Sequence, residues 1–79
     1  MTKGTIDKLA TGRAIKTEMD AQGITFRDMS NALGISFQAV WKYCEGQSLP
    51  TLENFYKISQ ILDVSINDLI KEKNMYIDD

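Results

Sequence analysis

The side chains best suited to bind a ligand lie between residues 36 and 45, and they are hydrogen-bonding and aromatic groups. On a helix that buries Val40 and Tyr43, six side chains of this segment face outward: Ser36, Phe37, Gln38, Trp41, Lys42 and Glu45. Amide, ammonium and hydroxyl groups hydrogen-bond to base edges and phosphates, and aromatic rings pack on thymine methyl groups. The segment therefore either reads a nucleic acid or is an ordinary solvated helix face.

Catalytic and metal chemistry find little support in the composition. The 79 residues include no histidine and one cysteine, so the commonest metal ligand and general base is missing and no internal disulfide can form. The sequence also lacks a nucleophile–base pair and a phosphate-cradling glycine loop. We therefore expect a protein that is not an enzyme and that holds no metal or cofactor.

Length and charge indicate one small domain. A chain of 79 residues with 43% hydrophobic and 25% charged residues has a globular composition and room for one core. Its apolar runs are too short to span a membrane and its start lacks a signal-peptide core, so we expect a cytoplasmic protein. The net charge of −2 argues mildly against indiscriminate nucleic-acid binding. Residues 63–79 carry most of the acidity, with five acidic residues and two lysines.

Two short amphipathic helices around one glycine are expected to position the outward-facing side chains. In residues 26–46, Met29 and Leu33 lie four apart on one helical face, and Gly34 follows directly. A glycine there can adopt positive φ and end the first helix, and Ser36 can cap the second. A helix pair joined by so short a turn is a helix-turn-helix unit.

Residues 26–45 resemble the helix-turn-helix of the phage repressor/Cro (XRE-like) DNA-binding family, and the resemblance extends from about residue 14 to residue 70. The matching positions are Met29, Ser30, Leu33, Gly34, Ile35, Val40, Tyr43, Gly46, Pro50, Thr51, Leu52, Ile58, Leu62, Asp63, Val64, Ser65 and Leu69. The resemblance implies an all-α fold, a compact five-helix lambda-repressor-like bundle. It also implies a sequence-specific regulator that binds double-stranded DNA, a phage- or plasmid-type repressor that occupies its operator as a homodimer.

The resemblance makes residues 36–45 the recognition helix, which fits the major groove. The expected base-reading residues are Ser36, Phe37, Gln38, Trp41 and Lys42. Gln38 can bond adenine at N6 and N7, and Lys42 can reach guanine or a phosphate.

Phosphate contacts are expected on both sides of this helix. The candidates are Lys16, Thr25, Phe26, Arg27, Gln47, Ser48, Thr51 and Asn54. The start of the second helix offers free N–H groups and a positive dipole end to a phosphate. For the loop after Gly46 and the helix start that follows, the contacts are implied by the resemblance, and loop and cap chemistry is the alternative.

Two aromatic residues depart from the family pattern. Phe26 stands where the family often has a glutamine, and Trp41 stands where it usually has a small or polar residue. Phe37 and Trp41 lie four apart and form an apolar ridge that packs on thymine methyls or wedges at the DNA, or binds a protein, unless Trp41 folds back onto the core. The alternative function is therefore a protein-binding module, such as an antirepressor, an antitoxin-like partner or an inhibitor, that uses Phe26, Phe37 and Trp41.

The chain is expected to fall into three parts: residues 1–12 as an N-terminal arm or short helix, residues 13–70 as the helix-turn-helix domain, and residues 71–79 as an acidic tail that trails off or extends the last helix. The first helix is expected over residues 13–22, because Gly12 weakens an earlier start. Lys3, Lys8 and Arg13 form either a basic arm on DNA phosphates or part of a frayed terminus.

Three further helix starts carry capping signals. Thr25 with Asp28 and Ser65 with Asp68 fit capping boxes, and Thr51 fits an N-cap. A helix is therefore expected to begin directly after Thr25, Thr51 and Ser65.

Four apolar or thiol-bearing residues have no expected place in the core. Cys44 has no visible partner and is expected to be an inert thiol. Met75, Tyr76 and Ile77 either dock on a second copy of the chain or belong to a disordered end.

Overall fold

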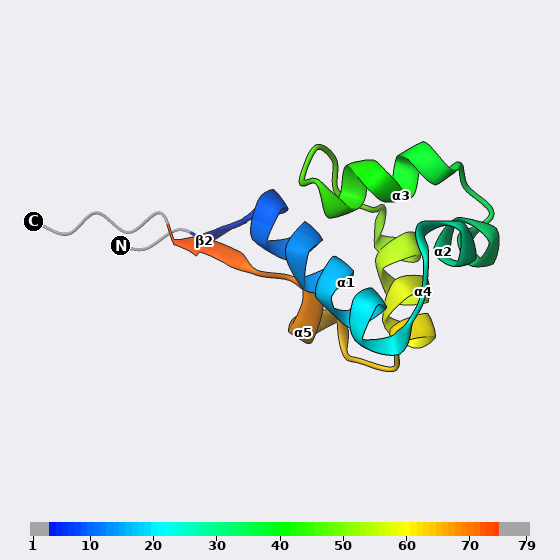
Figure 1. Cartoon of the computed structure of the whole chain (residues 1–79). Coiled ribbons are helices and arrows are strands. Elements are labelled where there is room, and N and C mark those ends of the chain that lie inside the picture. The colour runs from blue at the N-terminus through cyan, green and yellow to red at the C-terminus, as the bar shows by residue number, and fades with distance from the viewer. Residues whose placement is uncertain (1–3, 75–79) are drawn as a thin grey trace, which may run out of the picture.

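The computed structural model describes residues 4–74, in which five helices pack together and a two-stranded sheet joins the two ends (Figure 1). The elements in chain order are β1 (Gly4–Ile6), α1 (Lys8–Gln22), α2 (Phe26–Leu33), α3 (Phe37–Cys44), α4 (Leu52–Leu62), α5 (Ile66–Leu69) and β2 (Glu72–Asn74). The expected five-helix bundle is confirmed. The small sheet was not expected from the sequence.

One hydrophobic core unites all five helices. Its buried apolar side chains are Ile15, Met19, Met29, Leu33, Val40, Cys44, Phe55, Ile58, Leu62 and Leu69. Burying one side chain of this size contributes about 1.5–3 kcal/mol, so the core and not helix propensity holds the short helices in place. Helix α3 packs against α1 and α2, which leaves its other side open.

The local signals at the helix starts are confirmed. Four helices begin at the expected hydroxyl caps, which are Thr25, Ser36, Thr51 and Ser65. The boxes completed by Asp28 and Asp68 are both present. Each such cap is worth about 1 kcal/mol, because it satisfies a backbone N–H group that the first helical turn leaves unpaired.

The turn between α2 and α3 closes around Gly34. This glycine has φ of 68°, and its N–H group donates to the carbonyl oxygen of Asn31 at 3.3 Å. The next N–H group, from Ile35, donates to the carbonyl oxygen of Ser30 at 3.1 Å. These two bonds end α2 in a left-handed cap, and α3 starts three residues later.

The first helix is longer than expected. It begins at Lys8 with Asp7 as its N-cap, whereas the prediction from the sequence began at Arg13 and was wrong. Gly12 lies inside this helix, and a Cβ atom at this position would clash with the backbone carbonyl oxygen of Tyr43. The glycine therefore lets α1 approach the last turn of α3, and this packing offsets its low helix propensity.

The two ends of the described chain meet in an antiparallel ribbon. Thr5 of β1 lies opposite Lys73 of β2, so residues 72–74 are a strand, and the alternative that they extend the last helix is wrong. Behind the ribbon, the buried Thr11 hydroxyl accepts a hydrogen bond of 2.9 Å from the Lys71 backbone N–H group. The Asp7 N–H group donates to the Lys71 carbonyl oxygen at 2.8 Å.

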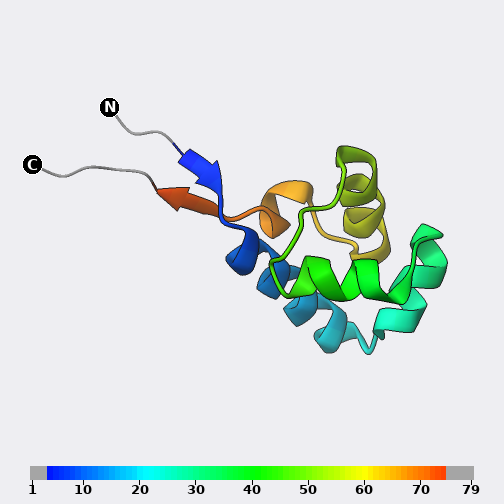
Figure 2. The same cartoon turned by 90° about the horizontal axis from the view of Figure 1, so that it is seen from above.

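We expected an arm or a short helix in residues 1–12. Of the described part of this segment, residues 4–6 form a strand and residues 8–12 are the first turns of α1. Lys3, Met75, Tyr76 and Ile77 lie outside the described residues. Figure 2 shows the ribbon projecting away from the helices. Between residues 4 and 74, no helix is long and apolar enough to cross a membrane.

Candidate nucleic-acid interface

Helix α3 presents one open face to the surroundings. All five residues expected to read bases are exposed: Ser36, Phe37, Gln38, Trp41 and Lys42. The opposite face buries Val40 and Cys44, which are four residues apart. We expected Val40 and Tyr43 to be buried. This is confirmed for Val40 and wrong for Tyr43, which is only partly buried; Cys44 is the second core residue of α3.

Cys44 is a core side chain without reactive character. Burial raises the pKa of its thiol to about 11, so the group stays protonated at neutral pH. This agrees with the expected inert thiol.

Phe26 and Phe37 join the start of α2 to the start of α3. Their ring centroids are 5.4 Å apart and the ring planes are nearly perpendicular at 88°, an edge-to-face arrangement. Such a pair contributes about 0.5–1.5 kcal/mol beyond the buried area. The side chain of Phe26 therefore helps to fix the orientation of α3.

Trp41 lies one turn beyond Phe37 on the same face of α3. Its exposed fraction is 39% and that of Phe37 is 49%. The interpretation in which Trp41 folds back onto the core is therefore wrong. Phe37 and Trp41 form an exposed apolar ridge along the helix, flanked by Gln38 and Lys42.

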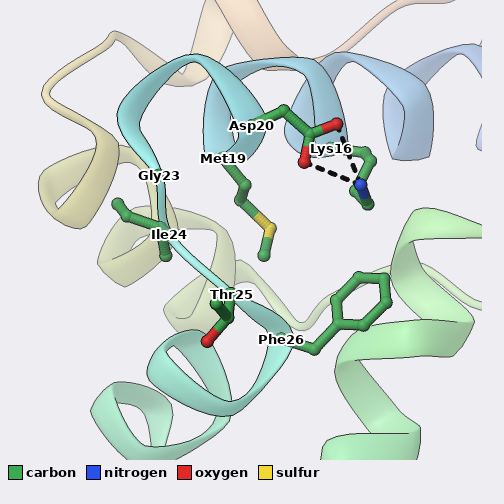
Figure 3. A pocket seen from close by; sticks show the side chains of 7 residues that line it. All are labelled: Lys16, Met19, Asp20, Gly23, Ile24, Thr25 and Phe26. Carbon is green, nitrogen blue, oxygen red and sulfur yellow. Dashed lines mark hydrogen bonds and ion pairs between the residues drawn. The ribbon is translucent and has the colours of Figure 1, made fainter.

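Lys16 and the start of α2 border a shallow hollow beside this ridge. Figure 3 shows Lys16 and Asp20 of α1 facing Thr25 and Phe26 across the hollow. The Lys16 Nζ atom lies 2.7 Å from the Asp20 Oδ1 atom and 5.5 Å from the centroid of the Phe26 ring. The hydrogen bond with Asp20 raises the pKa of the Lys16 ammonium group, and the Asp20 carboxylate balances its positive charge.

The capping box occupies part of the expected phosphate seat at the start of α2. The Asp28 N–H group donates to Thr25 Oγ1, and the Thr25 N–H group donates to Asp28 Oδ2, both at 3.0 Å. The backbone hydrogen bond from Thr25 lowers the pKa of Asp28, so this end of the helix already carries a carboxylate. The amides of Phe26 and Arg27 are the N–H groups of the first turn that remain for an anion, next to the exposed Arg27 side chain.

The second group of expected phosphate contacts lies after α3. Gln47 is exposed and Ser48 is partly buried, while Thr51 Oγ1 accepts from the Asn54 N–H group at 3.1 Å as a helix cap. The Asn54 side-chain amide donates to the Tyr43 hydroxyl at 3.3 Å. This bond joins α4 to α3, so Asn54 has a structural role that the sequence did not reveal.

Three residues that matter for the interface were missed or misjudged from the sequence. Asp7, Thr11 and Gly12 fix the start of α1, against which the end of α3 packs. An aspartate directly before a helix is a common N-cap, so the sequence did carry a signal for Asp7. We did not use it because Gly12 suggested that the helix starts after residue 12. Across residues 4–74, no three His, Cys, Asp or Glu side chains come together in a way that could hold a metal ion.

Comparison with known proteins identifies the family and the fold. A helix-turn-helix family model matches residues 15–69, which include all five helices except the first turns of α1. The chain belongs to the helix-turn-helix family of the phage repressor/Cro (XRE-like) type. The family model thus covers the exposed face of α3 and the elements that hold it.

One curated relative is the cryptic phage CTXphi transcriptional repressor RstR of Vibrio cholerae serotype O1, which is 36% identical over 63 residues. The aligned region covers 80% of this chain and 51% of the relative, so the chain spans about half of that protein's length.

Two solved structures share the helix-turn-helix fold. The restriction-modification controller protein C.AhdI from Aeromonas hydrophila superposes with a TM-score of 0.74 at 22% identity, over 80% of this chain and 96% of that one. The SOS-response transcriptional repressor LexA from Eubacterium rectale gives 0.77 at 19% identity, over 92% and 78%. At such identities the likeness confirms the fold.

Proposed function

We propose that the chain is a sequence-specific regulator that binds double-stranded DNA and represses transcription by occupying an operator. The observation that carries this proposal is the open face of α3, where Gln38 and Lys42 flank the Phe37–Trp41 ridge on a family helix-turn-helix. The repressor function of the phage relative supports it.

Base reading is assigned to α3 in the major groove, which is about 12 Å wide and accepts one helix. Gln38 bonds adenine through its amide, and Lys42 donates to guanine or to a phosphate. Phe37 and Trp41 pack on thymine methyl groups. Ser36 caps the helix through its oxygen and can still donate its hydroxyl proton to a phosphate.

Phosphate contacts on one side of the groove are assigned to α1 and α2. Lys16 can exchange its exposed pairing with Asp20 for a phosphate, while the Phe26 and Arg27 amides and the Arg27 guanidinium donate nearby. Thr25 is the weaker candidate, since its N–H group and hydroxyl already serve the capping box.

On the other side, Gln47, Ser48 and the start of α4 are assigned to the DNA backbone. The Thr51 hydroxyl caps α4 and the Asn54 side-chain amide bonds to Tyr43, so both already have a hydrogen-bond partner within the protein. The exposed Gln47 is therefore the strongest candidate of this group for a phosphate contact. A regulator of this kind acts on the DNA in the cytoplasm, as a homodimer on inverted half-sites.

The test is selection of bound duplexes from a random double-stranded library at ~150 mM salt, where non-specific binding is weak. An enriched motif that the Gln38→Ala variant binds more weakly supports the proposal. If that motif is an inverted repeat, it supports the dimer as well. No enrichment by folded protein overturns the proposal.

A protein-binding module is the second candidate, favoured by the exposed ridge of Phe37 and Trp41. The two candidates differ in their response to salt, because DNA binding weakens steeply as counterions are added and an apolar protein contact does not. Trp41→Ala weakens binding in both cases, but only a protein-binding face loses most of its affinity at this one aromatic side chain, whereas DNA binding keeps its phosphate contacts and its steep salt dependence.

A further inference from the structure

Phe37 receives little restraint from its own helix. It is the first residue of α3, and its side chain is 49% exposed. Inside a helix the preceding turn limits the χ1 rotamers of an aromatic side chain, but a residue at the helix start has no preceding turn. Ordering such a side chain on a ligand costs binding free energy. A neighbour that holds the ring before the DNA arrives therefore strengthens the contact that the ring makes.

Phe26 is such a neighbour, and it comes from a different helix. The two ring centroids are 5.4 Å apart and the ring planes meet at 88°. This edge-to-face contact is directional, because the positive edge of one ring is attracted to the negative face of the other. A contact of this kind holds the Phe37 ring in one orientation at the open side of α3.

Phe26 is itself fixed from two sides. Its side chain is partly buried and packs against the hydrophobic core. The Lys16 Nζ atom lies 5.5 Å from the centre of its ring, and Figure 3 shows the ring pointing out of α2 toward this lysine. Lys16 is held in turn by both carboxylate oxygens of Asp20, at 2.7 and 2.9 Å. The ring on which Phe37 rests therefore has a defined position before any ligand binds.

The group in the major groove that an apolar ring can recognise is the 5-methyl group of a pyrimidine, since the other base-edge groups there are hydrogen-bond donors and acceptors. Thymine carries this methyl group, and 5-methylcytosine carries it on the same ring atom. Phe37 and Gln38 are consecutive, so they are about 1.5 Å apart along the helix axis, which is less than the ~3.4 Å between successive bases. Both side chains therefore reach the same base pair or two adjacent ones.

We propose that Phe26 is a positioning residue, which holds the Phe37 ring against a pyrimidine 5-methyl group beside the adenine that Gln38 reads. Phe26 thereby sets specificity for the methyl group without touching a base. The inference rests on the proposed function, because it assigns a further role within the same DNA interface. It also names the chemical class that the ring requires, a 5-methylpyrimidine.

The test is a methyl scan of the selected duplex, measured by fluorescence anisotropy with the full chain. In one arm each thymine is replaced in turn by deoxyuridine, which lacks the methyl group and keeps every hydrogen-bonding group. In the other arm each cytosine is replaced by 5-methylcytosine. Burying one methyl group is worth about a fourfold change in affinity. We expect a loss of this size at one thymine, or a gain of this size at one cytosine, and the arm that responds identifies the base.

Four variants separate positioning from direct contact. Phe37→Ala should bind the duplexes with and without the methyl group equally. Phe26→Leu keeps an apolar side chain but removes the ring, and should reduce the methyl effect from about fourfold to below about twofold. Phe26→Tyr keeps the ring and should retain the full effect. Gln38→Ala is the control that should lose the adenine preference and keep the methyl effect, and circular dichroism checks that each variant is folded.

Three results overturn the role of Phe26. The wild type could respond to no methyl group in either arm, or Phe26→Leu could keep the full methyl effect. Phe26→Leu could also lose the adenine preference together with the methyl effect, which would indicate displacement of the whole helix. Each of these results, obtained on a duplex that the chain has selected, refutes only this inference. A folded chain that selects no duplex refutes the proposed function, and this inference with it.

Discussion

Gln38→Ala is the sharpest test of base reading by α3. The side chain is exposed and outside the core, so its removal should leave the free energy of unfolding within about 0.5 kcal/mol of the wild type. A bidentate amide–adenine contact is worth about 1–3 kcal/mol, which corresponds to about a 5- to 150-fold loss of affinity on the best site. Preference at one base pair should relax at the same time.

The assay is titration of the selected duplex by fluorescence anisotropy, repeated on duplexes substituted at each position. Gln60→Ala is the matched control, because it makes the same substitution at an exposed position of α4 that no proposed contact uses. Lys42→Ala provides the contrast in charge: if Lys42 neutralises a phosphate, its removal makes the log–log salt slope less steep by about 0.9, while Gln38→Ala leaves the slope unchanged.

Equal loss on every duplex after Gln38→Ala would refute the reasoning, because a side chain that reads one base must change the preference at that base. Unchanged affinity on the best site would refute it as well. In either case the exposed amide would be part of a solvated helix face.

Three further predictions follow from contacts within the fold. Gly12→Ala should lower the melting temperature, because overlap with the Tyr43 carbonyl costs about 1–3 kcal/mol while alanine's better helix propensity returns about 1 kcal/mol; a raised melting temperature would show that α1 can shift freely. Asp28→Asn should destabilise the protein at pH 7. The Asp28 pKa is lowered in the folded state, so its stabilisation is present above pH 3.8 and is lost as the pH falls through the folded value; the wild-type and variant melting temperatures should converge there. Cys44 should resist iodoacetamide at pH 8 in the native protein and react in urea, and equal rates in both would contradict its burial.

The sequence predicted well those features whose causes lie within a few residues. The caps at Thr25, Ser36 and Thr51 each bond a backbone N–H group three residues ahead, and Gly34 ends α2 through bonds to the turn before it. Such contacts depend on residue type and spacing, which the sequence displays directly. The exposed face of α3 followed from the same local geometry.

The features that were missed depend on contacts between distant residues. Thr11 bonds to Lys71, which is 60 residues away, and this contact joins the two ends of the fold beside the ribbon. Gly12 lowers the helix propensity of α1, but the close approach of the Tyr43 carbonyl leaves no room for a Cβ atom there. The choice between Tyr43 and Cys44 as a core residue was a one-residue ambiguity between two apolar side chains, and only the packing of α3 on α1 and α2 decides it.

These distant contacts share a consequence for the recognition helix. Helix α3 has eight residues, and a helix this short is not stable in isolation. Phe26 holds its first turn, while Gly12 and the Asn54–Tyr43 bond hold its last. None of these contacts reads a base in the proposed complex, so substitutions at Gly12 or Asn54 should weaken binding to all sequences alike. Substitution of Gln38 should instead change which sequence is bound.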